Sequence, residues 1–202
     1  MKVTIKTPST NTLEIKKSKF IANIFPIKSA DEAKEIIKQI SKEHNKANHN
    51  CYAYIVEGYE KSNDDGEPSG TAGKPILEVI KNNHLEDVLI IVTRYFGGIK
   101  LGASGLIRAY ADASNETIKN AHKIIIKSLK VYQYDFDYSL INIIEKFLVD
   151  KDIRIIDKIY DVKVSYLLAI NEPNFNQELI DYTLNKVKIS FVNEQEFEFK
   201  ID

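Results

Sequence analysis

The segment DVLIIVTRYFGGIKLGASGLIRAYADASNETIKNA, residues 87–121, places a strand, a glycine-rich loop and a helix in direct succession. Its first part, residues 87–93, is an apolar run rich in β-branched residues, which is typical of a buried strand. Residues 94–102 contain three glycines and predict a loop. Residues 103–121 predict a helix with a small-residue face, which lets a helix lie close to a sheet. That face consists of Leu106, Ala109, Tyr110, Ala113 and Thr117.

The residues before this segment predict the same strand–loop–helix order. Residues 50–56 indicate a strand, residues 58–72 a polar loop, and Gly73 the start of a helix that ends near Asn83. Pro75 suits the first turn of that helix, because a helix leaves its first N–H groups unpaired. Further upstream, residues 13–27 predict one or two strands. Ser29 and Glu32 then form a capping-box pattern that opens a helix to about His44.

The pattern changes near residues 125–130. Strands over 127–138, 153–160, 162–170 and 189–200 alternate with helices over 139–151, capped by Ser139, and 174–186. The order β-α-β-β-α-β is that of the split βαβ or ferredoxin-like arrangement. We therefore expect an α+β protein with two domains, residues 1–127 and residues 128–202, joined without a low-complexity linker.

Composition favours a protein of the cytoplasm. Cys51 is the single cysteine, so no intramolecular disulfide can form, and this usage fits a reducing compartment. The N-terminus lacks the apolar stretch of a signal peptide, and apolar runs such as 88–92 are too short to span a bilayer. We expect no membrane association.

Charge is unevenly distributed along the chain. Residues 1–130 hold 20 Lys and Arg against 15 Asp and Glu, whereas residues 131–202 hold 8 against 14. This difference indicates two domains with different surfaces. Neither half is basic enough to establish nucleic-acid binding on charge alone.

Seven of the eight glycines lie between Gly66 and Gly105, in two loops that each follow a strand and precede a helix. Glycines allow close backbone approach, and a helix start offers unpaired N–H groups to an anion. The loops are therefore a plausible anion or phosphate-backbone site. Equally, the glycines could serve only tight turns and helix packing. The candidate binding residues are Asp64, Asp65, Glu67, Ser69, Thr71, Lys74, Arg94, Tyr95, Phe96, Gly97, Gly98, Lys100, Gly105 and Arg108.

Known catalytic motifs are incomplete in both loops. Aligned on Gly66, the P-loop pattern needs glycine at Thr71, and aligned on Gly73 and Lys74 it needs Ser or Thr at Pro75; the Rossmann glycine pattern is absent. The nucleophile-elbow pattern around Ser104 needs glycine at Leu106. We therefore assign no catalytic residue, no metal ligand and no cofactor.

The acidic run Asp64, Asp65 and Glu67 has three interpretations. Pairing of Asp65 or Glu67 with Arg94, which would tie the loops together, ranks first, and Mg²⁺ binding ranks second. The third is a solvated turn whose carboxylates cap backbone N–H groups. His49 and Cys51 would share one face of a strand, so a nucleophile–base pair is conceivable, although a small buried core cysteine is favoured.

Tyr95 and Phe96 beside Arg94 form the remaining motif. Aromatic rings stack on bases and Arg contacts phosphate, but the same residue types also form protein-binding hot spots. Core packing is the alternative for Phe96.

Four runs together resemble the IMPACT family, whose bacterial members include YigZ-like proteins. The resemblance covers roughly residues 14–115, with Ser104 standing where the family's glycine is expected. The runs are KKSKF at 16–20, HNCYA at 49–53, DDGEPSGTAGK at 64–74 and VTRYFGGIKLGASGLIRAY at 92–110.

The resemblance implies a fold and a role. It implies an N-terminal left-handed β-α-β domain, as in some ribosomal proteins and domain IV of elongation factor G. It also implies a ferredoxin-like second domain resembling domain V of that factor. Eukaryotic relatives of the first domain act in translational control, competing for an activator of a stress kinase.

These observations favour a non-catalytic regulator or accessory factor of translation. It would bind RNA, the ribosome or a translation-linked protein through the glycine-rich loops, with Arg94, Lys100 and Arg108 contacting phosphate or an acidic partner. The alternative is a hydrolase that uses a metal at the acidic loop or the Cys51–His49 pair.

Overall fold

The computed structural model describes residues 1–201, which form two compact units. Unit 1 comprises Met1–Ile126 together with the C-terminal residues from Phe199, and unit 2 comprises Lys127–Glu198. None of the helices within residues 1–201 combines the length and the apolar character that a membrane span requires.

Unit 1 is built on a five-stranded sheet in which every neighbouring pair is antiparallel. The strand order is β2-β3-β6-β4-β5. The strands are β2 (Ser9–Ile15), β3 (Ser18–Pro26), β4 (His49–Val56), β5 (Tyr59–Asn63) and β6 (Val88–Tyr95). A further strand, β1 (Lys2–Ile5), pairs with the first residues of β7 (Lys123–Phe136).

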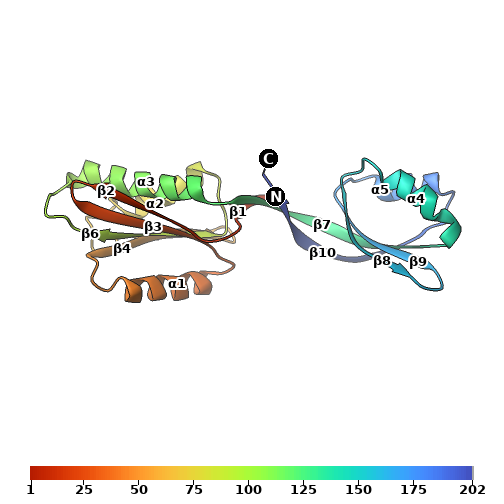
Figure 1. The fold of residues 1–202 in the computed structure, drawn as a ribbon, viewed down its shortest axis with the longest axis horizontal. Coiled ribbons are helices and arrows are strands. Elements are labelled where there is room, and N and C mark those ends of the chain that lie inside the picture. The colour runs from red at the N-terminus through yellow and green to blue at the C-terminus, as the bar shows by residue number, and fades with distance from the viewer. Residues whose placement is uncertain (202) are drawn as a thin grey trace. The chain divides into compact units, whose positions relative to one another are not determined.

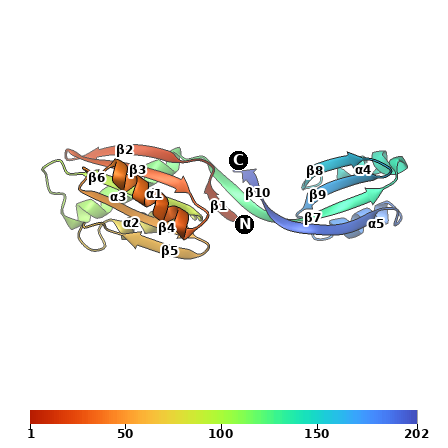
Figure 2. The same cartoon turned by 90° about the horizontal axis from the view of Figure 1, so that it is seen from below.

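Helices cover both faces of this sheet. Figure 1 shows α2 (Gly73–Asn82) and α3 (Gly102–Asn120) on one face and α1 (Ala30–Glu43) on the other, and Figure 2 shows α1 lying across the strands. The central strand β6 is consequently buried on both faces, and Val88 to Val92 are each 0% exposed. A strand in this position has a continuous apolar sequence instead of an alternating one.

Local sequence signals account for the helix positions. Ser29 accepts a hydrogen bond from the Glu32 N–H at 3.1 Å, which confirms the predicted start of α1. Pro75 lies in the first turn of α2, as predicted. The predicted small-residue face of α3 is buried, with Ala109 and Tyr110 at 0% exposure.

Unit 2 contains its elements in the predicted β-α-β-β-α-β order. They are β7, α4 (Ile141–Leu148), β8 (Ile153–Tyr160), β9 (Val164–Ile170), α5 (Phe175–Tyr182) and β10 (Lys188–Lys200). The sheet order is β10-β7-β9-β8, and α4 and α5 lie over one face of the sheet (Figure 1). Residues Tyr134, Phe136, Tyr166 and Phe175 form the aromatic centre of this core.

Four local predictions were wrong. Residues 59–63 form the exposed edge strand β5 instead of a loop, and β1 was not predicted. Strand β6 continues through Arg94 and Tyr95, which were assigned to the following loop. Ser139 does not cap α4, because it lies inside the short 3₁₀ turn η1 (Tyr138–Leu140) that precedes the helix.

Candidate functional site

Asp64 organises the loop between β5 and α2, residues 64–72. Its carboxylate accepts hydrogen bonds from the backbone N–H groups of Gly70 (2.8 Å), Ala72 (3.0 Å) and Gly73 (2.8 Å). Gly73 is the first residue of α2, so the carboxylate also lies at the positive end of that helix. Partial burial alone would raise the pKa of Asp64, but these three hydrogen bonds outweigh it and lower the pKa.

Asp65 fastens the same loop to the start of β4. Its carboxylate accepts the Asn50 N–H at 2.6 Å, and its backbone oxygen lies 2.8 Å from His49 Nδ1. The residue adopts a φ of 43°, and its own N–H donates to Asn63 Oδ1 at 2.7 Å. The backbone turn is therefore held from both sides.

A buried ion pair connects the β5–α2 loop to the end of β6, just before the second glycine-rich loop. Arg94 Nη1 donates to Glu67 Oε1 at 2.6 Å, and the Tyr110 hydroxyl of α3 donates to the same oxygen at 2.8 Å. The side chains of Arg94 and Glu67 are only 7% and 3% exposed. The predicted pairing of an acid of the first loop with Arg94 is confirmed, with Glu67 as the acid and Arg94 in β6.

Burial changes the role of Arg94. Its guanidinium carbon lies 5.5 Å from the ring centroids of both Phe20 and Phe96. Its Nε is buried and makes no hydrogen bond with the residues that the structure describes. The expected contact between Arg94 and phosphate is therefore wrong, because its guanidinium is sealed beneath aromatic rings and paired with Glu67.

Cys51 is a core residue of this network. Its Sγ lies 2.9 Å from the Asp64 carbonyl oxygen and 3.3 Å from the Tyr110 hydroxyl oxygen, and its single S–H can donate to either of them. Burial, with smaller contributions from the nearby acids, raises the pKa of the Cys51 thiol to about 12. The ionised thiolate is the nucleophilic form, so this environment disfavours the cysteine-hydrolase interpretation. The His49 ring contacts the acidic loop, with Nδ1 at 2.8 Å from the Asp65 carbonyl oxygen and Nε2 at 3.8 Å from Glu67 Oε2.

The loop between β6 and α3, residues 96–101, presents its side chains to solvent. Phe96 is 45% exposed, and Lys100 is exposed. The loop backbone is nevertheless fixed, because the Phe96 N–H donates to Asn48 Oδ1 at 2.8 Å and the Gly97 N–H to Ser18 Oγ at 3.2 Å. A Cβ at Gly97 would lie 2.0 Å from the Lys17 carbonyl carbon, so only glycine fits there.

The predicted binding residues fall into three groups, which are buried, partly exposed and exposed. Glu67, Thr71 and Arg94 are buried, whereas Asp64, Tyr95, Gly97 and Gly105 are partly exposed. Tyr95 extends its hydroxyl to His44 Nδ1 at 3.0 Å. The exposed set consists of Asp65, Ser69, Lys74, Phe96, Gly98, Lys100 and Arg108.

The sequence-based set omitted the turn between β2 and β3. Lys16 and Lys17 form this two-residue turn with φ values of 46° and 64°, and both are exposed, as is Lys19 beside them. Lys17 touches the β6–α3 loop at Gly97. The KKSKF run was noted only for its resemblance to the family. Asn-Gly is the usual sequence signal for a two-residue turn, so the two lysines did not predict a turn here. Tyr110 was also omitted, since it was assigned only to a helix face.

The carboxylates that could bind a metal at the acidic loop already stabilise the fold. Both carboxylate oxygens of Asp64 and one of Glu67 already accept hydrogen bonds. Within residues 1–201, no group of three or more His, Cys, Asp or Glu side chains is arranged to hold a metal ion.

The fold and this site define a class of two-unit α+β proteins, in which a buried ion pair joins a glycine-rich loop to the central strand of an antiparallel sheet. The Impact N-terminal domain family matches residues 16–118. The IMPACT family member YvyE of Bacillus subtilis (strain 168) is 39% identical over 176 residues, covering 86% of this chain and 81% of that protein. The chain belongs to the IMPACT family.

Two further similarities extend over nearly the whole chain. The IMPACT family member YigZ of Escherichia coli (strain K12) is 30% identical over 195 residues, covering 93% of this chain and 96% of that protein. A crystal structure of a hypothetical protein matches with a TM-score of 0.60 and 28% identity, covering 96% of this chain and 98% of that one.

Proposed function

We propose that this protein is a non-catalytic accessory or regulatory factor of translation that binds RNA, most simply on the ribosome. The contact surface, here called the tip surface, joins the β2–β3 turn to the β6–α3 loop and the first turns of α3. Its residues are Lys16, Lys17, Lys19, Phe96, Lys100 and Arg108.

The observation that carries the proposal is the separation of charges at this end of unit 1. The acids of the β5–α2 loop bind backbone N–H groups or the buried Arg94, while the cations of the tip surface are exposed. Phe96 adds an exposed ring on which a base could stack. Exposed cations beside an aromatic ring suit a phosphate backbone with unpaired bases.

Family membership supports the link to translation. The resemblance to the IMPACT family implies translational control for eukaryotic relatives, and it implies folds shared with a ribosomal-protein type domain and with elongation factor G. We accordingly assign residues 1–127 to the left-handed β-α-β domain and residues 128–202 to a ferredoxin-like domain.

Co-sedimentation with ribosomes and gel shifts with single-stranded RNA, both over a range of salt concentrations, test the proposal. Log affinity should fall by about 0.7 per phosphate contact for each tenfold increase in salt. The double variant Lys17→Met/Lys100→Met should bind more weakly and with a smaller salt slope. Lys38→Met is the matched control, since Lys38 is an exposed lysine of α1, on the opposite face of the sheet from α2 and α3. Equal loss in the control would contradict a role for the tip surface.

Crosslinking in lysate with and without nuclease distinguishes RNA from a protein partner. An RNA contact predicts that crosslinked ribosomal proteins disappear after nuclease treatment. A crosslink that survives nuclease and is lost in Lys17→Met/Lys100→Met would assign the tip surface to a translation-linked protein instead.

A further inference from the structure

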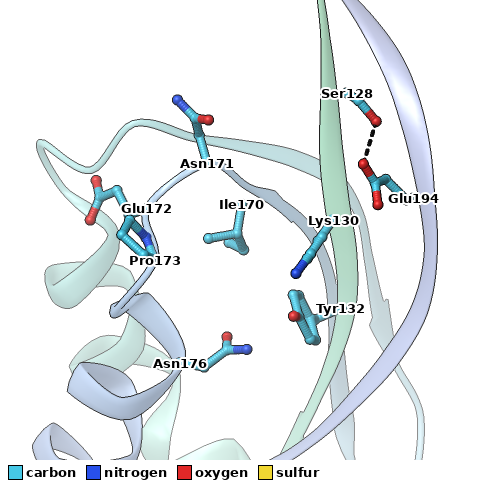
Figure 3. A pocket seen from close by; sticks show the side chains of 9 residues that line it. All are labelled: Ser128, Lys130, Tyr132, Ile170, Asn171, Glu172, Pro173, Asn176 and Glu194. Atoms are coloured by element: carbon cyan, nitrogen blue, oxygen red, sulfur yellow. Dashed lines mark hydrogen bonds between the residues drawn. The ribbon is translucent and has the colours of Figure 1, made fainter.

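Unit 2 contains a cavity of about 350 Å³ that is remote in sequence from the glycine-rich loops. It lies between β7, β10 and the connection from β9 to α5 (Figure 3). Its volume is at the lower end of the range for small-molecule sites. A single small metabolite would fill it, whereas a folded partner would not.

One side of the cavity offers hydrogen-bond donors. Lys130 of β7 directs its amine into the space, and within residues 1–201 it makes no ion pair or hydrogen bond. The amide of Asn176 is oriented by Tyr134, whose hydroxyl donates to Asn176 Oδ1 at 2.5 Å. The NH₂ group of Asn176 has no hydrogen-bond partner within residues 1–201 and is therefore available to a ligand. An ammonium and an amide donor together suit a carboxylate.

An acceptor lies on the same side of the cavity as Lys130, where β7 and β10 run side by side (Figure 3). Glu194 of β10 receives the Ser128 hydroxyl at 2.7 Å through Oε1, which leaves Oε2 able to accept from a ligand. Glu172 also lines the cavity, but its carboxylate is turned away from the centre. It accepts the Asp152 N–H at 3.0 Å and lies 3.6 Å from Lys151 Nζ, so its charge is already compensated.

Apolar side chains line the space beside these polar groups. Figure 3 shows the ring of Tyr132, the side chain of Ile170 and the ring of Pro173 around the central space. Ile170 is 7% exposed, and Tyr132 packs against Tyr134 and Phe191 at centroid distances of 6.4 and 5.5 Å. These contacts fix the walls independently of any ligand.

We propose that this cavity binds a free α-amino acid with an apolar side chain. The α-carboxylate lies between Lys130 and Asn176, the α-ammonium donates to Glu194, and the side chain packs between Tyr132, Ile170 and Pro173. The assignment follows from donors and an acceptor that lie side by side, as the carboxylate and ammonium on one α-carbon require, with apolar walls next to them. It adds a ligand site in unit 2 to the proposed role of unit 1, and it does not depend on RNA binding.

Isothermal titration calorimetry of the full chain with the twenty amino acids, one at a time, tests the proposal. At least one apolar or aromatic amino acid should bind. Its carboxamide, which lacks the carboxylate, and its N-acetyl form, which lacks the ammonium, should each bind about tenfold more weakly or worse. Failure of every amino acid to bind at millimolar concentration would overturn the proposal. Equal binding of the N-acetyl form would overturn the role of Glu194 and with it the amino-acid assignment.

Three variants locate the bound ligand. Lys130→Met should lower affinity by about tenfold or more, because it removes the cation that faces the carboxylate. Asn176→Asp keeps the acceptor for Tyr134 but replaces the donor with an anion, so it should also weaken binding. Lys186→Met, an exposed lysine outside the cavity, is the matched control and should bind like the unmodified protein. Unchanged affinity in both cavity variants would place the ligand elsewhere and refute the site.

Discussion

The β5–α2 loop and the β6–α3 loop are both glycine-rich and both lead into a helix, but they are stabilised in different ways. The first loop turns its acidic side chains inward, where Asp64 binds three backbone N–H groups and Glu67 binds Arg94. The second loop is anchored through its backbone N–H groups to Asn48 and Ser18, which leaves Phe96 and Lys100 exposed.

The side chains of the first loop therefore stabilise the fold, whereas those of the second loop can contact a partner. Asp64 and Glu67 are poorly placed to bind a partner, because Asp64 accepts three backbone N–H groups and the Glu67 side chain is only 3% exposed. Side chains of the second loop are available, since its backbone supplies the stability. Substitutions in the first loop should therefore change the free energy of unfolding, and substitutions in the second should change binding.

Glu67→Ala should have the largest effect. It leaves the buried guanidinium of Arg94 without its anion, and breaking a buried pair in this way costs about 3–5 kcal/mol. Urea unfolding measures the loss. The exposed acid Glu78 on α2 provides a control, because Glu78→Ala should change stability by no more than about 0.5 kcal/mol.

The double variant Glu67→Met/Arg94→Met sharpens the same test. Removing both charges avoids the unpaired guanidinium, so the double variant should be more stable than Glu67→Ala. If the double variant were the less stable of the two, the cost would lie in packing and not in the lost charge pair.

Asp64→Ala should be the next largest change. It removes the acceptor for three backbone N–H groups, one of them at the first residue of α2. Loss of a charged cap of this kind costs about 2 kcal/mol. Asp65→Ala should cost less in the same urea experiment, since the Asp65 carboxylate accepts the single N–H of Asn50. The reverse ranking would contradict the view that Asp64 is the centre of the loop.

The pH dependence of stability follows from the lowered pKa of Asp64. Its hydrogen bonds favour the ionised form in the folded state, whereas an unfolded aspartate has a pKa near 3.9. The stabilisation is therefore complete above about pH 5 and decreases as the pH falls through 3.9 and below. The stability difference between the unmodified protein and Asp64→Asn should shrink over that acidic range. A difference that stayed constant down to pH 2 would show that ionisation of Asp64 is irrelevant.

Many of the helices and strands could be predicted, because they depend on signals in their own stretch of sequence. The capping residue Ser29, the proline of α2 and the apolar run of β6 each reflect a requirement of their own element. Strand β5 was missed because all of its residues are exposed and all but Tyr59 are polar, so the strand is defined by pairing with β4 and not by its own sequence. Strand β1 was missed for a similar reason, since its partner β7 is more than a hundred residues away.

The site was predictable in composition but not in detail. An acid of the first loop was expected to pair with Arg94, yet only the fold determines that Glu67 makes the pair and Asp65 faces Asn50. Arg94 was assigned to a loop and to phosphate contact because the sequence does not show where β6 ends. Strand β6 continues past Thr93 through Arg94, and this places the Arg94 guanidinium against the ring of Phe96.

Lys100→Met should have the smallest effect on stability and still weaken binding. Lys100 is exposed, and within residues 1–201 it forms no ion pair, so the free energy of unfolding should change by no more than about 0.5 kcal/mol. RNA affinity at low salt should fall, and the salt slope should decrease by about 0.7 if the lysine neutralises one phosphate. Urea unfolding and gel shifts on the same preparation measure both quantities. A loss of stability without a change in salt slope would show that Lys100 stabilises the fold and does not contact RNA. The two loops would then not differ in the way described above.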